Sequence, residues 1–323
     1  MNNRERLSYA APKDSKLKRG LIELIEIATG RPKLDRLYKS LDPNSDLNIW
    51  EQIVRVLEID VTFDRERLEI IPAEGEGPLV IVANHPFGVV DGILICYLAS
   101  LRRQKFKILT NNVLCAIPGV EQYFLPVEFG LTREAVDLNV NTRKEALASL
   151  DRGEAILIFP GGAVSTAKKP FGVAEDPDWN PFTSKLILKS KAKVVPIFFA
   201  GQNSRLFQIA SHIGPSLRLS LLLNEITNKI GKKIDVRIGD AIEHTELINF
   251  PTRQELMTFL RNHTYSLKEQ EQDKKERKKA RKKAERILRE GLAKLKQQLD
   301  ESRQKRAQSK SDAAEKPFPW IEP

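Results

Sequence analysis

The sequence predicts an α/β fold in which a mostly parallel or mixed central sheet is flanked by helices. Two short runs, Leu79–Ala83 and Ala155–Phe159, are rich in branched apolar residues and have the length of strands buried on both faces. Segments with helical spacing of apolar residues lie between such runs, and this alternation is typical of a parallel sheet covered by helices. We therefore expect one main α/β domain with extensions at both ends.

Residues 1–60 are predicted to form an N-terminal helical region. Apolar residues recur with helical spacing in Leu17–Ala28, after a polar and charged start. Shorter helices are expected at Leu34–Leu41 and Trp50–Ile59, with Asp46 as the N-cap of the second. These helices either pack on the main domain or present an apolar face to lipid, and the sequence leaves both interpretations open.

The main domain is predicted to span residues 61–267. Its expected strands are Leu68–Pro72, Leu79–Ala83, Lys107–Thr110, Tyr123–Val127, Ala155–Phe159, Lys193–Phe199, Ser216–Leu223 and Asp235–Ile238. Its expected helices are Asp91–Arg103, Arg143–Asp151 and Phe182–Ser190. Because no sequence repeat is present, these elements are interpreted as one domain.

Residues 268–323 are predicted to form a basic helical tail with a loose C-terminus from Pro317. The net charge of the chain is +10, and most of the excess lies in Lys268–Lys310. One apolar stripe on this helix is made by Leu288, Leu292, Leu295 and Leu299. Such a helix suits an anionic membrane surface, nucleic acid, a partner helix or plain solvation. Since the body of the chain is nearly neutral, we do not expect nucleic acid as a partner.

The composition argues against several other classes of protein. The two cysteines, Cys96 and Cys115, are too few for a disulfide framework and fit a reducing compartment. The start lacks the apolar stretch of a secretory signal, and the most apolar stretch, Pro78–Leu101, is broken by prolines and charges. We expect no metal and no cofactor, since there is no Gly-rich phosphate loop and no metal-ligand spacing among His212, His244 and His263.

Catalytic chemistry is predicted in the loop between a buried strand and the next helix, where α/β folds place ligand sites. This loop carries His85 and, six positions later, Asp91. A neutral imidazole is a suitable general base near pH 7, and a carboxylate on its other ring nitrogen stabilises the imidazolium that forms. Pro86 and Gly88 turn the chain between the two residues. A core histidine beside a helix-capping Asp91 is the alternative interpretation.

Three segments carry a resemblance to a known family. They are Asn84-His85 with Asp91, the run Phe159-Pro160-Gly161-Gly162-Ala163-Val164-Ser165, and Val195-Pro196-Ile197. Their kind and order resemble the glycerolipid acyltransferase superfamily, the lysophosphatidic acid acyltransferase-like proteins, over about residues 70–240. That family has Asn-His, four residues and Asp, then Phe-Pro-Glu-Gly-Thr-Arg, then a later Val-Pro-Ile.

This chain departs from the family pattern at three points. Five residues separate His85 from Asp91, and Gly88 can absorb the additional one. Gly161 and Val164 stand where the family has Glu and Arg, which help to hold the phosphate or glycerol of the substrate. The His-Pro-Phe-Gly form resembles a bacterial branch labelled as hemolysins or lyso-ornithine lipid acyltransferases. A lysophospholipid and a lyso-aminolipid both remain open as acceptor.

The resemblance implies an O-acyltransferase that moves a fatty acyl group from acyl-ACP or acyl-CoA to a lysolipid hydroxyl, peripherally on the cytoplasmic face of a membrane. His85 would be the base and Asp91 its partner. Backbone N–H groups of Gly161 and Gly162 would bind the oxyanion, unless these glycines only form a turn. The expected substrate-binding residues are Asn84, Gly88, Phe159, Pro160, Gly161, Gly162 and Ser165. The alternative is a catalytically weak relative that binds membrane or nucleic acid through its basic tail.

Overall fold

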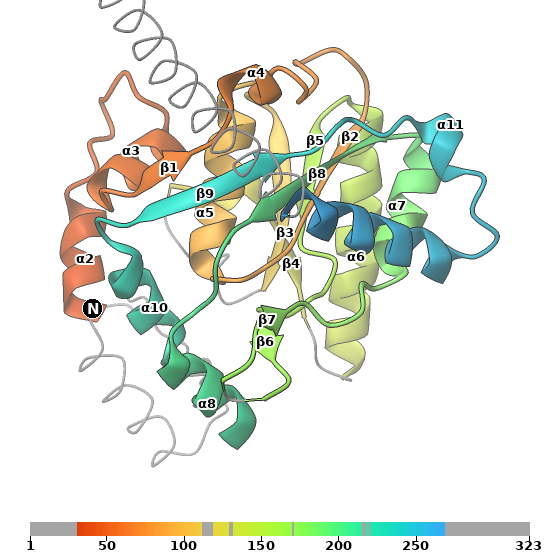
Figure 1. Ribbon diagram of the computed structural model, residues 1–323. Helices are drawn as coiled ribbons and strands as arrows, with labels where there is room; N and C mark the ends of the chain where they lie inside the picture. The colour runs from red at the N-terminus through yellow and green to blue at the C-terminus, as the bar shows by residue number, and fades with distance from the viewer. Residues whose placement is uncertain are drawn as a thin grey trace, which may run out of the picture. The chain divides into compact units, whose positions relative to one another are not determined.

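The computed structural model of the chain describes residues 31–111, 119–128, 132–169, 171–214, 218 and 220–268 (Figure 1). The helix predicted at Leu17–Ala28 and the basic tail after its first residue, Lys268, therefore lie outside the described residues. So does Cys115, whereas Cys96 is a buried free thiol, as its apolar surroundings predict.

Within the described residues, the fold is built on a seven-stranded sheet with the order β1-β9-β8-β2-β5-β3-β4. β8 and β9 pair antiparallel, and the other neighbouring pairs in this sheet are parallel, which confirms the predicted fold class. The strands are β1 (Asp60–Thr62), β2 (Leu79–Ala83), β3 (Phe106–Asn111), β4 (Phe124–Val127), β5 (Ala155–Ile158), β8 (Lys193–Phe199) and β9 (Lys233–Ile238). A separate hairpin is formed by β6 (Thr166–Ala167) and β7 (Ala174–Glu175).

The central strand β2 shows why a run of branched apolar residues forms a buried strand. Successive side chains point to opposite faces of a sheet. Leu79 and Ile81 belong to the apolar cluster on one face, and Val80 and Val82 belong to the cluster on the other. All four are at most 1% exposed. Both faces of the sheet are therefore covered, as the sequence of this strand predicts.

Helices form a layer on each face of the sheet (Figure 1). Side chains of α3, α5 and α10 contribute to the first cluster, and those of α6, α7 and the helical residues 253–268 contribute to the second. The bounds are α2 (Arg31–Lys39), α3 (Ile49–Val56), α4 (Arg65–Leu68), α5 (Val89–Ser100), α6 (Arg133–Asp151), α7 (Phe182–Ser190), α8 (Arg205–Ile213), α10 (Leu222–Lys229) and α11 (His244–Leu247), with the 3₁₀ turn η3 (Glu121–Tyr123). No described helix is both long enough and apolar enough to cross a bilayer.

The helices α2 and α3 pack on the domain, which is one of the two interpretations that the sequence leaves open. Leu34, Trp50 and Val54 are buried in the first cluster. The Trp50 ring also packs edge-on against Tyr123, with ring centroids 5.4 Å apart. The N-cap of α3 is Asn48, whose side chain accepts the Glu51 N–H, so the assignment of this role to Asp46 was wrong.

Two predicted strands are also wrong. Leu68 ends the short helix α4, and the rest of Leu68–Pro72 is turn and loop. The described part of Ser216–Leu223 is helix and turn, and Leu222 begins α10. Short apolar runs fit a buried strand and one face of a helix equally well, so tertiary contacts decide between them. β1 and α8 were not predicted, and α6 begins at Arg133, ten residues before the predicted Arg143.

Candidate active site

The candidate site forms where parallel strands end. β2 pairs in parallel with β5 on one side and β8 on the other, so their carboxyl ends lie along one edge of the sheet. His85 follows β2 and Phe159 follows β5. Their rings stack with centroids 4.0 Å apart and planes inclined by 24°. The sheet thereby joins two segments that are far apart in the sequence.

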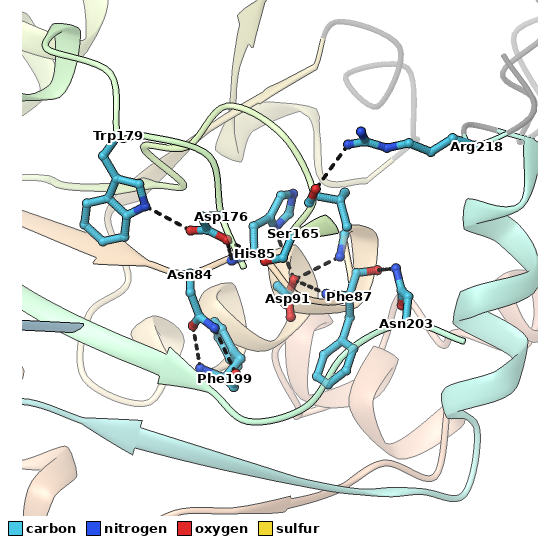
Figure 2. Close-up of polar contacts among 12 residues, drawn as sticks. Asn84, His85, Phe87, Asp91, Ser165, Asp176, Trp179, Phe199, Asn203 and Arg218 are labelled. Carbon is cyan, nitrogen blue, oxygen red and sulfur yellow. Dashed lines mark hydrogen bonds and ion pairs between the residues drawn. The ribbon is translucent and has the colours of Figure 1, made fainter. Parts of the chain in front are cut away.

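His85, in the loop after β2, and Asp91, in the first turn of α5, face one another. His85 Nδ1 lies 3.1 Å from Asp91 Oδ2, at ion-pair distance but without the alignment of a good hydrogen bond. The same oxygen accepts the N–H groups of Phe87 at 2.7 Å and Gly88 at 2.9 Å (Figure 2). Gly88 has a φ of 80°, a conformation that favours glycine, and this turn accommodates the five-residue spacing. Asp91 therefore has two roles, since it caps the start of α5 and also orients the imidazole of His85.

The electrostatics of Asp91 depend on its complete burial. Burial raises the pKa of Asp91 above its ordinary value, while His85 and the Phe87 and Gly88 N–H groups act in the opposite direction. Its second oxygen, Oδ1, has no hydrogen-bond partner among the described residues. The carboxylate thus lies in an apolar setting where a positive charge on the adjacent imidazole stabilises it strongly.

The other side of the imidazole faces a cavity of about 830 Å³. His85 lines this cavity, and its side chain is 18% exposed. One part of the wall is apolar and comes from α2, α3 and the loop between them, through Leu34, Leu37, Leu41, Ile49 and Ile53. The base candidate is therefore open to a cleft while its carboxylate partner is closed off from it, as the sequence interpretation requires.

Two arginines bring positive charge to the same cavity. Arg143 lines it with its guanidinium 5.1 Å from the ring centre of Phe182. Arg218 also lines it and donates to the Val164 carbonyl at 3.2 Å. Burial lowers the pKa of Arg218, which reflects a poorly solvated charge. A cavity with an imidazole, two guanidinium groups and an apolar arm suits an amphipathic substrate.

Comparison with known proteins identifies the family of the chain. The family model described as Acyltransferase matches residues 46–273, which is most of the chain. The chain belongs to the acyltransferase family. The family relationship that the three motifs predict is therefore confirmed.

Two curated relatives of this acyltransferase are lyso-glycine lipid O-acyltransferases. The one from Bacteroides thetaiotaomicron is 24% identical over 216 residues, which cover 65% of this chain and 76% of the relative. The one from Phocaeicola vulgatus is 22% identical over 216 residues, covering 65% and 74%. A crystal structure of the 1-acyl-sn-glycerophosphate (LPA) acyltransferase PlsC from Thermotoga maritima has 18% identity and a TM-score of 0.44, covering 78% of this chain and 88% of that one.

Four of the seven predicted substrate-binding residues of the acyltransferase line the cavity, namely Gly88, Phe159, Pro160 and Gly162. The other three, Asn84, Gly161 and Ser165, are not among the residues that line it, so their part in substrate binding stays a prediction. Asn84 is 3% exposed and pairs with the Phe199 backbone, donating to its carbonyl at 2.9 Å and accepting its N–H at 2.7 Å. Its amide is therefore occupied in tying the loop to the end of β8.

The two glycines of the second motif differ in what they do. An added Cβ on Gly161 would lie 3.3 Å from the Asp176 Cβ, so this position leaves little room for any side chain. Gly162 has a φ of 65°, and its N–H donates to the Phe159 carbonyl at 3.0 Å. The N–H of Gly162 is thus occupied within the turn, which favours the turn interpretation for this residue over the role of oxyanion donor.

Phe87 anchors the loop that carries His85 and is not among the residues that line the cavity. Its ring packs so closely on Gly201 that an added Cβ there would come within 2.7 Å. Lys229 Nζ lies 4.3 Å from the ring centre, and burial lowers the pKa of this lysine. The aromatic residue between His85 and Gly88 thus fixes the loop from which the imidazole projects.

Sequence reasoning missed Asp176, which is 4% exposed. This residue connects the His85 loop with the segment that carries Ser165. Its Oδ1 accepts the His85 N–H at 3.0 Å and the Ser165 hydroxyl, and its Oδ2 accepts Trp179 Nε1–H at 2.9 Å (Figure 2). Ser165, predicted to bind substrate, is thus engaged with a buried carboxylate. Asp176 lies in an irregular Asp-Pro-Asp-Trp segment, and no local pattern marks it as a partner of the His85 loop.

Replacing Asp176 with alanine is expected to destabilise the fold by about 3 kcal/mol or more, because two buried donors and the partly buried His85 N–H lose their acceptor at about 1–3 kcal/mol each. Chemical denaturation monitored by circular dichroism measures this change. The matched control is Asp178→Ala, since Asp178 is exposed in the same segment and should change stability by no more than about 0.5 kcal/mol. Equal stability of the two variants would show that Asp176 does not organise the site.

Proposed function

We propose that this acyltransferase transfers a fatty acyl group from acyl-ACP or acyl-CoA to the hydroxyl of a lysolipid at a membrane surface, with His85 as general base. The observation that carries the proposal is the His85–Asp91 pair, 3.1 Å apart, with the imidazole at the wall of a cavity that is largely apolar. The family match and the two lyso-glycine lipid O-acyltransferase relatives support the reaction class.

The proposed reaction is a direct transfer. Because Nδ1 of His85 faces Asp91, Nε2 is left to remove the proton from the acceptor hydroxyl. The oxygen attacks the thioester carbonyl, a C–O bond forms, and a tetrahedral oxyanion results. The C–S bond then breaks, and the imidazolium of His85 returns its proton to the thiolate. Asp91 stays ionised and stabilises the imidazolium between the two proton transfers, so no covalent enzyme intermediate is needed.

The oxyanion requires donors close to the base. Ala163 and Val164 line the cavity directly after the Gly161-Gly162 turn. Their backbone N–H groups have no hydrogen-bond partner in the part of the chain that the structure describes. We assign them the oxyanion role that the sequence interpretation gave to the glycines, since backbone N–H groups fixed in a turn stabilise developing charge without reorganising.

The cavity has one region that suits the fatty chain of the substrates and another that suits a charged group. Its apolar wall from α2 and α3 suits a fatty chain. Its arginines, Arg143 and Arg218, suit an anionic group of the acceptor headgroup or of the donor.

We favour a lyso-aminolipid over a lysophosphatidic acid as acceptor. The family residues that hold phosphate or glycerol are replaced by Gly161 and Val164, and the packing of Asp176 against Gly161 leaves little room for a Glu side chain. The curated relatives act on a lyso-glycine lipid by name, which agrees with this choice.

The proposal is tested with purified protein, acyl-CoA or acyl-ACP, and a panel of lyso-glycine lipid, lyso-ornithine lipid and lysophosphatidic acid, with products identified by mass spectrometry. We expect the diacylated aminolipid as the main product, with slower acylation of lysophosphatidic acid. Release of free fatty acid with no acylated lipid would instead identify a thioester hydrolase and contradict the proposal.

A further inference from the structure

Large apolar side chains gather on the outer face of α8 and on the adjacent hairpin. Five of the nine large apolar side chains that are exposed in the described residues belong to this surface, which we call the α8 patch. Its members are Phe171 at 75% exposed, Val173 at 64%, Leu206 at 57%, Ile209 at 39% and Ile213 at 71%. Contiguous exposed apolar groups of this kind mark interaction sites, whereas single ones are common on any surface.

The helix α8 is apolar on two sides, and among the described residues only one of these sides is packed in an apolar cluster. Phe207 and Ala210 are buried in a small cluster with Val164, Leu221 and Leu222. The outward residues Leu206, Ile209 and Ile213 follow at intervals of three and four, which places them on one face of the helix. Since the inward face already packs α8 on the domain, the apolar side chains of the outward face are not required for folding and indicate a different role.

The hairpin contributes to the same surface from a separate segment. Arg205 donates to the Gly172 carbonyl at 3.2 Å, and its guanidinium lies 5.9 Å from the ring centre of Phe171. Gln208 of α8 accepts the Ala167 N–H of β6 at 2.9 Å. These contacts hold the hairpin beside α8, where Figure 1 also shows β6 and β7 near that helix. The patch is therefore assembled by tertiary contacts and is not the property of one segment.

Within the two segments that form the α8 patch, every Lys, Arg, Asp or Glu residue is basic. Lys168, Lys169 and Arg205 are exposed at its border. Residues 165–174 and 205–214 contain no Asp or Glu. The adjacent Glu175 lies 3.4 Å from Arg261 in an ion pair. Apolar side chains bordered by cations fit the boundary between the acyl chains and the headgroups of an anionic bilayer, where each cation adds to the attraction.

The α8 patch lies directly behind one wall of the cavity. Val164 and Leu222, which pack in the same cluster as Phe207 of α8, both line the cavity. Arg218, another lining residue, has its guanidinium 5.9 Å from the Phe207 ring centre. One layer of side chains therefore separates the outer face of α8 from the space that would hold the substrate.

We propose that the α8 patch is the surface by which the protein docks on an anionic lipid bilayer, bringing the cavity to its lipid substrate. The docking proposal rests on the proposed function only in its choice of a lipid acceptor. The occupant is the bilayer itself, because the patch joins large aliphatic and aromatic side chains with basic residues and contains no acidic one. A second copy of the chain would bring basic residues against basic residues.

The test compares two triple variants of the full chain. The patch variant is Phe171→Ser, Leu206→Ser and Ile213→Ser. The matched control is Leu101→Ser, Val136→Ser and Ile248→Ser, which removes exposed apolar residues from elsewhere on the surface. Binding to vesicles of phosphatidylglycerol and phosphatidylcholine is measured by sedimentation. We expect the patch variant to bind about ten-fold or more weakly than the wild type, and the control to bind like the wild type, since residues 269–323 are the same in each protein.

Two further measurements separate this proposal from the proposed function. Transfer to a monomeric short-chain lysolipid in free solution should be equal in all three proteins, whereas transfer to a lysolipid embedded in vesicles should fall only in the patch variant. Absence of transfer in the wild type would overturn the proposed function but leave the binding result readable. Vesicle binding of the patch variant at the wild-type level would overturn the docking proposal. So would the finding that the wild type and the control are dimers in solution while the patch variant is a monomer.

Discussion

The variant His85→Ala is expected to transfer acyl groups about 10²-fold or more slowly than the wild type, which is the usual contribution of a general acid–base residue. Alanine removes the proton acceptor at the cavity wall and leaves Asp91 without the imidazole 3.1 Å away. The fold should persist, because the ring contributes mainly its stack on Phe159. Initial rates at saturating donor and acceptor, normalised to folded protein, measure the effect.

The matched control for this variant is His212→Ala. His212 is exposed on α8 and does not line the cavity, so its removal should leave transfer to a soluble lysolipid unchanged. If both alanine variants turned over at the wild-type rate, the assignment of the base to His85 would be refuted.

The variant Asp91→Asn is expected to lower transfer by about 10²-fold or more, because the amide no longer stabilises the imidazolium by its charge. Asparagine has the same size, and its carbonyl oxygen can still accept the N–H groups of Phe87 and Gly88. The loss should appear in kcat, since the imidazolium exists only after proton transfer.

The same substitution should not lower stability at neutral pH. Burial raises the pKa of Asp91, so the folded carboxyl holds its proton more tightly than the unfolded one does. This group therefore makes the folded state less stable as the pH rises from the unfolded pKa through the folded one. Asparagine removes that dependence. We expect an unfolding free energy at pH 8 equal to or above that of the wild type, measured by urea denaturation between pH 4 and 8. A large loss of stability at pH 8 with unchanged transfer would contradict the assigned role.

The sequence predicts the buried central strands of the sheet better than the edge strand β1 and the helix α10. β2 and β8 were predicted with the bounds observed, because strands buried on both faces must be continuously apolar. β1 has three residues with exposed or half-buried side chains, and it exists through its pairing with β9, which is distant in sequence. The apolar residues that begin α10 have the same local pattern as a strand, and only their packing against α5 and α2 makes them helical.

In the candidate site, too, some residues could be predicted from the sequence and others could not. The His85–Asp91 pair was predictable because the two residues are only six positions apart, in the loop after β2 and in the first turn of α5, and Gly88 between them allows the chain to turn. Asp176 was not, since it reaches the His85 loop only through the folded arrangement of a separate segment. The contacts of Asn84 could not be predicted, because motif resemblance gives the position of a side chain in the sequence but not its direction. Asn84 points to β8 and not into the cavity.

The central claim is that the imidazole of His85 is the general base. Chemical rescue of a His85→Gly variant by free imidazole tests this claim most directly. The cavity of about 830 Å³ at this position is large enough to admit free imidazole. With His85→Gly, we expect transfer to rise with imidazole concentration and to follow the fraction of neutral imidazole as the pH is varied, while wild-type rates do not rise. A folded His85→Gly variant that matches the wild type without imidazole, or that gains nothing from any concentration of it, would contradict the assignment of the base.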